Sequence, residues 1–177
     1  MTDLYTPSPG DIGLTQIHGD VGLGIRTAQW LDGDGFVDYE HAFVHTGGGW
    51  IVEAEPGGAR VGHTAEYVHN TVLWLSCPTE YGAAVAAAAE AYVGVPYSFL
   101  DYGAIAARRL HLPVPGLREY IGDTGHMICS QLADRAAADG GWHLFADGRW
   151  PGYVTPGDLY RLQIVQDEIA LRAGDEG

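Results

Sequence analysis

The sequence predicts an α+β domain in which an antiparallel sheet packs against helices. Short runs that alternate apolar and polar residues, rich in β-branched and aromatic side chains, occur mainly in the first half of the chain. Alanine-rich patterns of helical period follow, and glycine and proline separate the segments. The chain has 177 residues, 46% of them hydrophobic, and no repeat or linker-like stretch. We therefore expect one domain over residues 1–177, with its core at about 8–162.

The centre of the predicted sheet is a hairpin. Residues 39–45 and 50–54 both alternate, and the glycine-rich segment 46–49 between them is typical of a turn. Other short strands are expected over residues 10–17, in an extended piece within 55–62, over the apolar run 71–76, and after a turn within 154–162.

Helices are predicted from residue composition and period. The alanine-rich segment 81–93 has Glu90 as its only charge, so we expect it to be largely buried. Further helices are expected over residues 100–110 and, from Cys129, to about Asp139, and a weaker helical pattern covers 22–31. The acidic tail 166–177 fits either a short helix or a frayed end.

The charge balance excludes some partners. The formal net charge is −14, from 23 acidic residues against 9 basic ones, all of them arginine. Such a chain repels nucleic acid and anionic lipid unless it holds a basic patch, and none is visible beyond Arg108 and Arg109. We expect no nucleic-acid partner. No segment approaches the length of a membrane span, and the N-terminus lacks the pattern of a secretory signal.

Metal ions are not expected. The loop from Asp32 to Gly35 has acidic spacing but lacks the later glutamate of a calcium-binding loop, so we interpret it as a solvated turn. A zinc site that joins His126 to Cys129 is disfavoured, because neither cysteine belongs to a Cys-x-x-Cys pair. No cofactor is predicted either.

The hairpin places a histidine near a carboxylate. His41 lies on its first strand and Glu53 on its second, and a carboxylate in reach fixes the tautomer of a histidine that acts as a base. His45 shares a strand face with His41, and Glu55 shares one with Glu53, so the period alone does not choose between them.

Cys129 is the best candidate for a nucleophile. It lies in the first turn of a predicted helix, where the helix dipole favours the thiolate. The alternative is a buried structural thiol, since free cysteine is often buried. The second cysteine, Cys77, ends an apolar run, and we expect it to pack as a small hydrophobe.

Six short motifs occur in an order that resembles the circularly permuted papain-like branch of the NlpC cell-wall peptidase superfamily. This is the YiiX-like group, to which lecithin retinol acyltransferase is distantly similar. The motifs are Gly10-Asp11-Ile12, His41-Ala42-Phe43-Val44, Ile51-Val52-Glu53-Ala54, Gly94-Val95-Pro96-Tyr97, Ile128-Cys129-Ser130 and Thr155-Pro156-Gly157-Asp158-Leu159.

The resemblance implies a permuted papain-like fold and a catalytic triad. It assigns Cys129 as nucleophile, His41 as base and Glu53 as the orienting residue. Tyr97 matches a tyrosine that lies near the oxyanion in ordinary members of the superfamily. The match to His-Ala-x-Val favours His41 over His45 as the base.

The implied activity is a cysteine peptidase or amidase that acts through an acyl-enzyme. Peptidoglycan stem peptides are the commonest substrate of the superfamily, and a lipid or thioester acyltransferase or esterase is the alternative. We expect a cytoplasmic or virion-associated protein, such as a tail-associated phage enzyme. A binding or structural subunit of a phage tail, with an unused site, is the hypothesis from another class. Fast alkylation of Cys129 would distinguish an enzyme from such a subunit.

Overall fold

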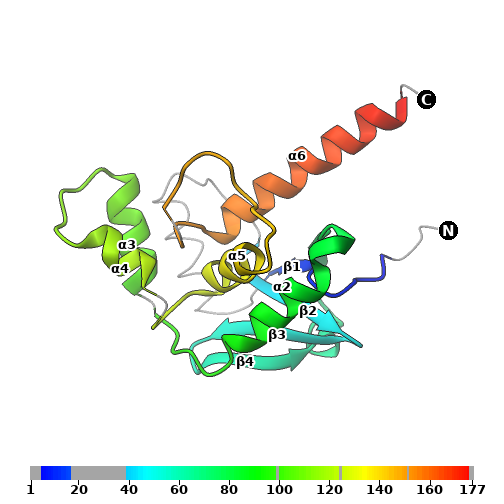
Figure 1. Cartoon of the computed structure of the whole chain (residues 1–177), viewed down its shortest axis with the longest axis horizontal. Coiled ribbons are helices and arrows are strands. Elements are labelled where there is room, and N and C mark those ends of the chain that lie inside the picture. Colours follow the sequence, from blue (N-terminus) through cyan, green and yellow to red (C-terminus); the bar gives the residue numbers. More distant parts are fainter. Residues whose placement is uncertain (1–4, 17–38, 99, 124, 151, 176–177) are drawn as a thin grey trace.

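The computed structural model describes residues 5–16, 39–98, 100–123, 125–150 and 152–175. These residues form an α+β structure with a five-stranded antiparallel sheet and several helices (Figure 1). The predicted α+β class is therefore confirmed. The weak helical pattern at 22–31 and the acidic loop at Asp32 to Gly35 lie outside the described residues.

The sheet has the strand order β4-β3-β2-β1-β5. Its strands are β1 (Ile12–Thr15), β2 (His41–Gly47), β3 (Trp50–Glu55), β4 (Gly58–His63) and β5 (Val72–Leu75). The five segments match the strands predicted in the first half of the chain. A single short helix, η1 (Thr64–Tyr67), connects β4 to the loop before β5.

The predicted hairpin is the pair β2 and β3. Val44 pairs with Val52, and the register shifts between His45 and Gly47. Gly47, Gly48 and Gly49 have φ angles of 110°, 60° and 85°. Only glycine adopts such angles readily, which is why the glycine run joins the two strands.

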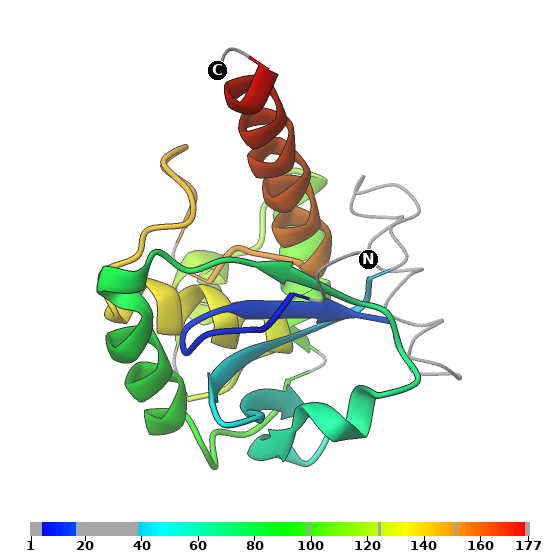
Figure 2. The same cartoon turned by 90° about the vertical axis from the view of Figure 1, so that its right-hand side faces the viewer.

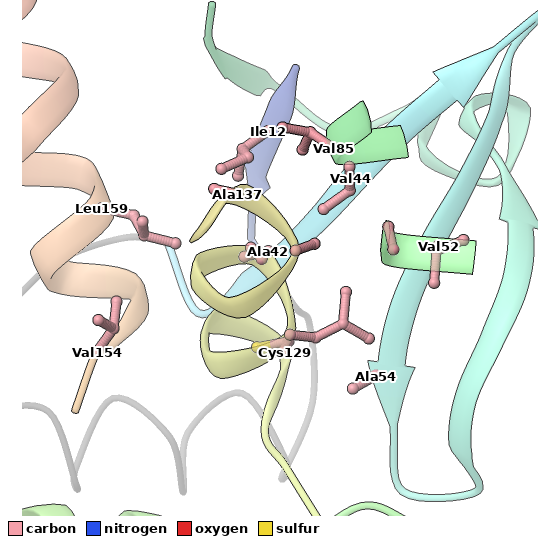
Figure 3. Packing of buried hydrophobic residues seen from close by; sticks show 14 of the residues in the cluster. Ile12, Ala42, Val44, Val52, Ala54, Val85, Cys129, Ala137, Val154 and Leu159 are labelled. Carbon is pink, nitrogen blue, oxygen red and sulfur yellow. The ribbon is translucent and has the colours of Figure 1, made fainter. Parts of the chain in front are cut away.

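Two helices cover one face of the sheet, α2 (Thr79–Ala91) and α5 (Cys129–Asp139) (Figures 1 and 3). The strands turn alternate apolar residues toward them. These residues are buried in the main core and are Ile12, Leu14, Ala42, Val44, Val52 and Ala54.

The prediction that the alanine-rich helix is largely buried is wrong. In α2 only Gly82, Val85, Ala86 and Ala89 are buried. The remaining alanines are mostly exposed, because alanine favours the helix and carries too little apolar surface to require burial.

A smaller cluster lies beside the main core. It joins Ile105 of α3 (Leu100–Arg109), Ile121 of α4 (Leu117–Gly122) and Ile128 directly before α5. The helix α3 was predicted, whereas no helix was predicted over the six-residue α4. In Figure 1 the two helices and their loop stand on the side of the molecule opposite both chain ends.

The strand predicted within 154–162 is wrong, because this segment begins the helix α6 (Pro156–Asp175). Thr155 caps the helix: its backbone N–H donates to Asp158 Oδ2 at 3.0 Å, and its Oγ1 accepts from the N–H of Asp158 at 3.2 Å. Proline at the first helical position supports the same start. The acidic tail continues this helix, which projects beyond the sheet (Figure 2). None of the described helices is long and apolar enough to cross a membrane.

Candidate active site

Cys129 is the first residue of α5 and is fully buried (Figure 3). Its thiol lies 3.8 Å from the carbonyl oxygen of Glu40, directly before β2. The preceding residue, Ile128, is extended, and its N–H donates to Gln131 Oε1 at 2.9 Å. The thiol therefore lies at the positive end of a capped helix, against the start of the strand that carries His41.

Buried polar side chains fix the start of α5. Ser130 Oγ donates to the carbonyl of Val154 at 2.8 Å, and Gln131 Nε2 donates to that of Gly152 at 2.9 Å. Further along, Arg135 Nη2 donates to the carbonyl of Ile121 at 2.8 Å. Because these bonds are buried, the helix start is held to two neighbouring segments.

His41 connects the thiol to a carboxylate. Its Nε2 lies 2.6 Å from Glu53 Oε2, and its side chain is also hydrogen-bonded to Cys129. Burial lowers the pKa of His41, but the hydrogen bonds and charges of Cys129 and Glu53 outweigh burial and raise it to about 10. The predicted proximity of His41 and Glu53 is confirmed, and Cys129 joins them from a distant part of the chain.

Glu53 is held by residues besides His41. The hydroxyl of Tyr67 donates to Oε2, and Arg60 Nη2 lies 2.7 Å from Oε1. Burial raises the pKa of Glu53, yet His41, Tyr67 and Arg60 together hold it below the ordinary value. The carboxylate is therefore ionised and fixed in position beside the imidazole.

The sequence did not indicate Tyr67 or Arg60. Arg60 stands directly opposite Glu53 in the register of β3 and β4, so counting across the turn after Glu55 would have found it. Tyr67 comes from the short helix η1 and stacks on Phe43, and its place follows from tertiary packing alone.

The structure also separates the rival candidates. His45 is as buried as His41, but its ring meets the edge of Trp74, and its Nδ1 has no hydrogen-bond partner among the described residues. Glu55 is partly exposed and accepts from Arg60 Nε at 2.7 Å. His41 and Glu53 are thus the pair that meets the thiol.

Tyr97 lies beside the segment that leads to Cys129. It forms an isolated bridge with Met127, and the flanking bonds run from Met127 N–H to the carbonyl of Pro96 and from Ser98 N–H to the carbonyl of Met127. Tyr97 packs against both hydrophobic clusters. Tyr97 therefore lies next to the segment that leads into α5.

A second histidine–carboxylate pair lies in the same region. His126 Nδ1 is 3.0 Å from Oδ1 of the buried Asp101, and the ring of Tyr120 lies 4.5 Å from that of His126. The pair joins the turn before α5 to the first turn of α3. No sequence pattern indicated it, because the two residues are 25 positions apart.

Three residues present possible metal ligands. Ligand atoms of His41, Glu53 and Glu55 lie within 4.8 Å of one another, and within the described part of the chain Cys129 joins no such group. The guanidinium of Arg60 already contacts both carboxylates. A cation at this point would have to displace Arg60, so the arrangement fits an ion-pair network better than a metal centre.

The chain matches no protein-family model, no curated protein and no solved structure. The geometry of the site, together with the sequence, therefore supports the functional proposal.

Proposed function

We propose that this protein is a cysteine hydrolase that cleaves an amide bond through Cys129, His41 and Glu53. The observation that carries the proposal is one buried chain of contacts from thiol to imidazole to carboxylate. A structural cysteine needs neither a raised histidine pKa nor an ionised carboxylate behind that histidine.

The first step forms an acyl-enzyme. Because Nε2 of His41 faces Glu53, Nδ1 is the ring nitrogen that takes the proton of Cys129. The thiolate attacks the carbonyl carbon, and a C–S bond forms. The C–N bond then breaks as imidazolium returns the proton to the departing amine.

The second step regenerates the thiol. His41 removes a proton from water, and the hydroxide attacks the thioester. The C–S bond breaks, the carboxylic acid leaves, and imidazolium returns the proton to the sulfur. Glu53 holds His41 in one tautomer and stabilises imidazolium in both steps. The N–H of Cys129 at the helix start can donate to the oxyanion, and we assign Tyr97 as the second donor.

We further propose that the fold is the permuted papain-like one. The support is the chain order, since the strands that carry His41 and Glu53 precede the helix that begins with Cys129. By the same resemblance, the amides to test first are peptidoglycan stem peptides, and a phage-associated enzyme is the setting we favour.

Acyl transfer is the second candidate function. Cys129 is 0% exposed and His41 only 3% exposed, so the site admits little water in this state. A dry acyl-enzyme persists until another acceptor arrives, which favours transfer to an amine or alcohol over hydrolysis. The ratio of hydrolysed to transferred product, measured with an added nucleophile, separates the two functions.

Iodoacetamide labelling as a function of pH tests the thiol chemistry. Cys129 is buried, so labelling requires transient opening of the site. We expect a fast phase at Cys129, identified by mass spectrometry, whose rate rises well below pH 8.5, the ordinary pKa of a free thiol. Cys129→Ala should remove the fast phase and Cys77→Ala should keep it. Slow labelling of Cys129 at every pH, unchanged in His41→Ala, would contradict the proposal and favour a structural subunit.

A further inference from the structure

The loop between α3 and α4 exposes apolar side chains at its tip. Leu110, Leu112 and Val114 are 58%, 51% and 47% exposed. Three such residues at alternate positions of one loop make a local apolar surface rather than scattered exposed residues.

The loop is rigidly built. The N–H of His111 donates to the carbonyl of Arg108 at 3.1 Å, and that of Leu112 to the carbonyl of Ala107 at 2.9 Å. His111 has a φ angle of 55°. This is the Schellman pattern that ends a helix, and Pro113 and Pro115 restrict the chain beyond it. The apolar tip is thus held outward by the backbone, and binding through it requires little further ordering.

Two arginines flank the tip, and neither has a carboxylate partner among the described residues. The guanidinium groups of Arg108 and Arg118 lie 4.7 and 5.7 Å from the centroid of the Trp150 ring. Neither forms an ion pair with any residue that the structure describes. By contrast, Arg60 and Arg149 contact carboxylates, so Arg108 and Arg118 differ from them in carrying charge that no described carboxylate neutralises.

Both arginines, Trp150 and part of the loop line a shallow, open depression of about 540 Å³. Its lining includes both arginines and the apolar loop, and Glu119 is the acidic residue among those that line it. In the sequence, residues 102–118 contain no aspartate or glutamate but hold three of the nine arginines. At physiological salt the distant acidic groups are screened beyond about 8 Å, so this local charge governs close approach.

We propose that the α3–α4 loop docks on the surface of an anionic phospholipid bilayer. A headgroup phosphate lies between Arg108 and Arg118, Trp150 lies at the interface, and Leu110, Leu112 and Val114 enter the acyl boundary. Charge complementarity carries the choice of occupant, because two arginines without a described carboxylate partner, beside an apolar tip and a tryptophan, match a negatively charged membrane surface. The net charge of −14 argued against anionic lipid, and this surface is the exception.

Vesicle co-sedimentation of the full chain tests the proposal. We expect at least tenfold tighter binding to vesicles containing phosphatidylglycerol than to phosphatidylcholine alone, with affinity falling as salt rises. The double variant Arg108→Glu, Arg118→Glu should lose that preference. The double variant Leu110→Ser, Leu112→Ser should weaken binding at least tenfold. Leu110, Leu112 and Arg118 are exposed and Arg108 is half-buried, so thermal melting verifies the fold of each variant.

Controls come from α6, where Arg161→Glu and Val165→Ser make similar changes at exposed positions and should bind like the unmodified protein. Equal binding to neutral vesicles, or no vesicle binding, would overturn the proposal. So would equally tight binding of inorganic phosphate, which indicates a soluble anion, or a dimer in sedimentation velocity that the leucine variant dissociates. The test uses no catalytic readout, so its result is independent of the proposed hydrolase activity.

Discussion

The two ends of β2 carry two histidines that differ only in their surroundings. His41 and His45 lie on the same strand face, and each is 3% exposed. His41 meets Glu53 and Cys129, whereas His45 meets the edge of Trp74 and leaves Nδ1 without a hydrogen bond among the described residues. The strand face and the burial of a histidine are therefore not enough to identify it as a catalytic base.

The two histidines differ because different residues of β3 and α5 lie beside each end of β2. At the His41 end, the diagonal neighbour on β3 is Glu53. The thiol of Cys129, the first residue of α5, contacts the carbonyl oxygen of Glu40 at the same end. At the His45 end, the opposite residue is Ile51, and β2 turns into its glycine bulge. A buried imidazolium needs a compensating negative charge, and only the first end provides one from the described residues.

Replacing His41 should have the largest effect. His41→Ala should lower hydrolysis by about 10⁴-fold, because the general base and the imidazolium acid are lost together. Iodoacetamide labelling below pH 8 should fall with it. The matched control is His45→Phe, and comparable losses in the two variants would contradict the assignment of the base.

Glu53→Gln should have the next largest effect, about 10²–10⁴-fold on hydrolysis. Cys129 and Glu53 together raise the pKa of His41 to about 10, and the glutamine removes the charge of Glu53 from this pair. The His41 pKa should therefore fall, and the alkaline limb of the pH–rate profile should move to lower pH. Glu55→Gln serves as the control, since Glu55 contacts Arg60. An alkaline limb that stays near pH 10 in Glu53→Gln would show that Glu53 does not set this titration.

Tyr67→Phe should have a moderate effect. It removes one hydrogen bond to the Glu53 carboxylate while keeping the stacked ring on Phe43. A hydrogen bond to a charged group contributes about 1.5–3 kcal/mol, and we expect part of this loss in stability and less than about tenfold in rate. Denaturant unfolding and steady-state kinetics measure both quantities. Tyr92→Phe is the control, because Tyr92 donates to Asp139 on the exposed end of α5.

His45→Phe should have the smallest effect. The ring volume is nearly kept, and a buried nitrogen without a partner is removed. We expect the free energy of unfolding to change by less than about 1 kcal/mol, and rates to stay near those of the unmodified protein. A large loss of activity with normal stability would mean that both ends of β2 serve the site.

The sequence predicted the five strands of the sheet, together with one strand at 154–162 that is a helix, and the half of the site that the hairpin brings together. Alternation and glycine turns are local signals, so they placed His41 and Glu53 on neighbouring strands of one hairpin, whereas the choice of His41 over His45 came from the resemblance. Tyr67 and the pair of His126 with Asp101 could not be predicted, because packing between distant segments brings these side chains to their partners. The start of α6 was a missed local signal, since Thr155-Pro156-Gly157-Asp158 is both a turn and a capping box.

The buried polar residues of α5 show a second reason why the sequence alone did not predict the whole site. Ser130, Gln131 and Arg135 have the composition of a solvated helix face, yet all three are buried and bonded to backbone carbonyls. Composition gives the average environment of a residue type and cannot reveal which carbonyls lie nearby.

The sequence separation of these contacts also implies an order of assembly. Glu53 lies 12 residues from His41, whereas Cys129 lies 89 residues from Glu40, whose carbonyl it contacts. Closing a short loop sacrifices less chain entropy than closing a long one, so the hairpin can form before α5 docks. During refolding, His41 and Glu53 would then be paired before Cys129 reaches them. The rate at which fast alkylation of Cys129 recovers during refolding would therefore report the docking of α5 rather than the formation of the sheet.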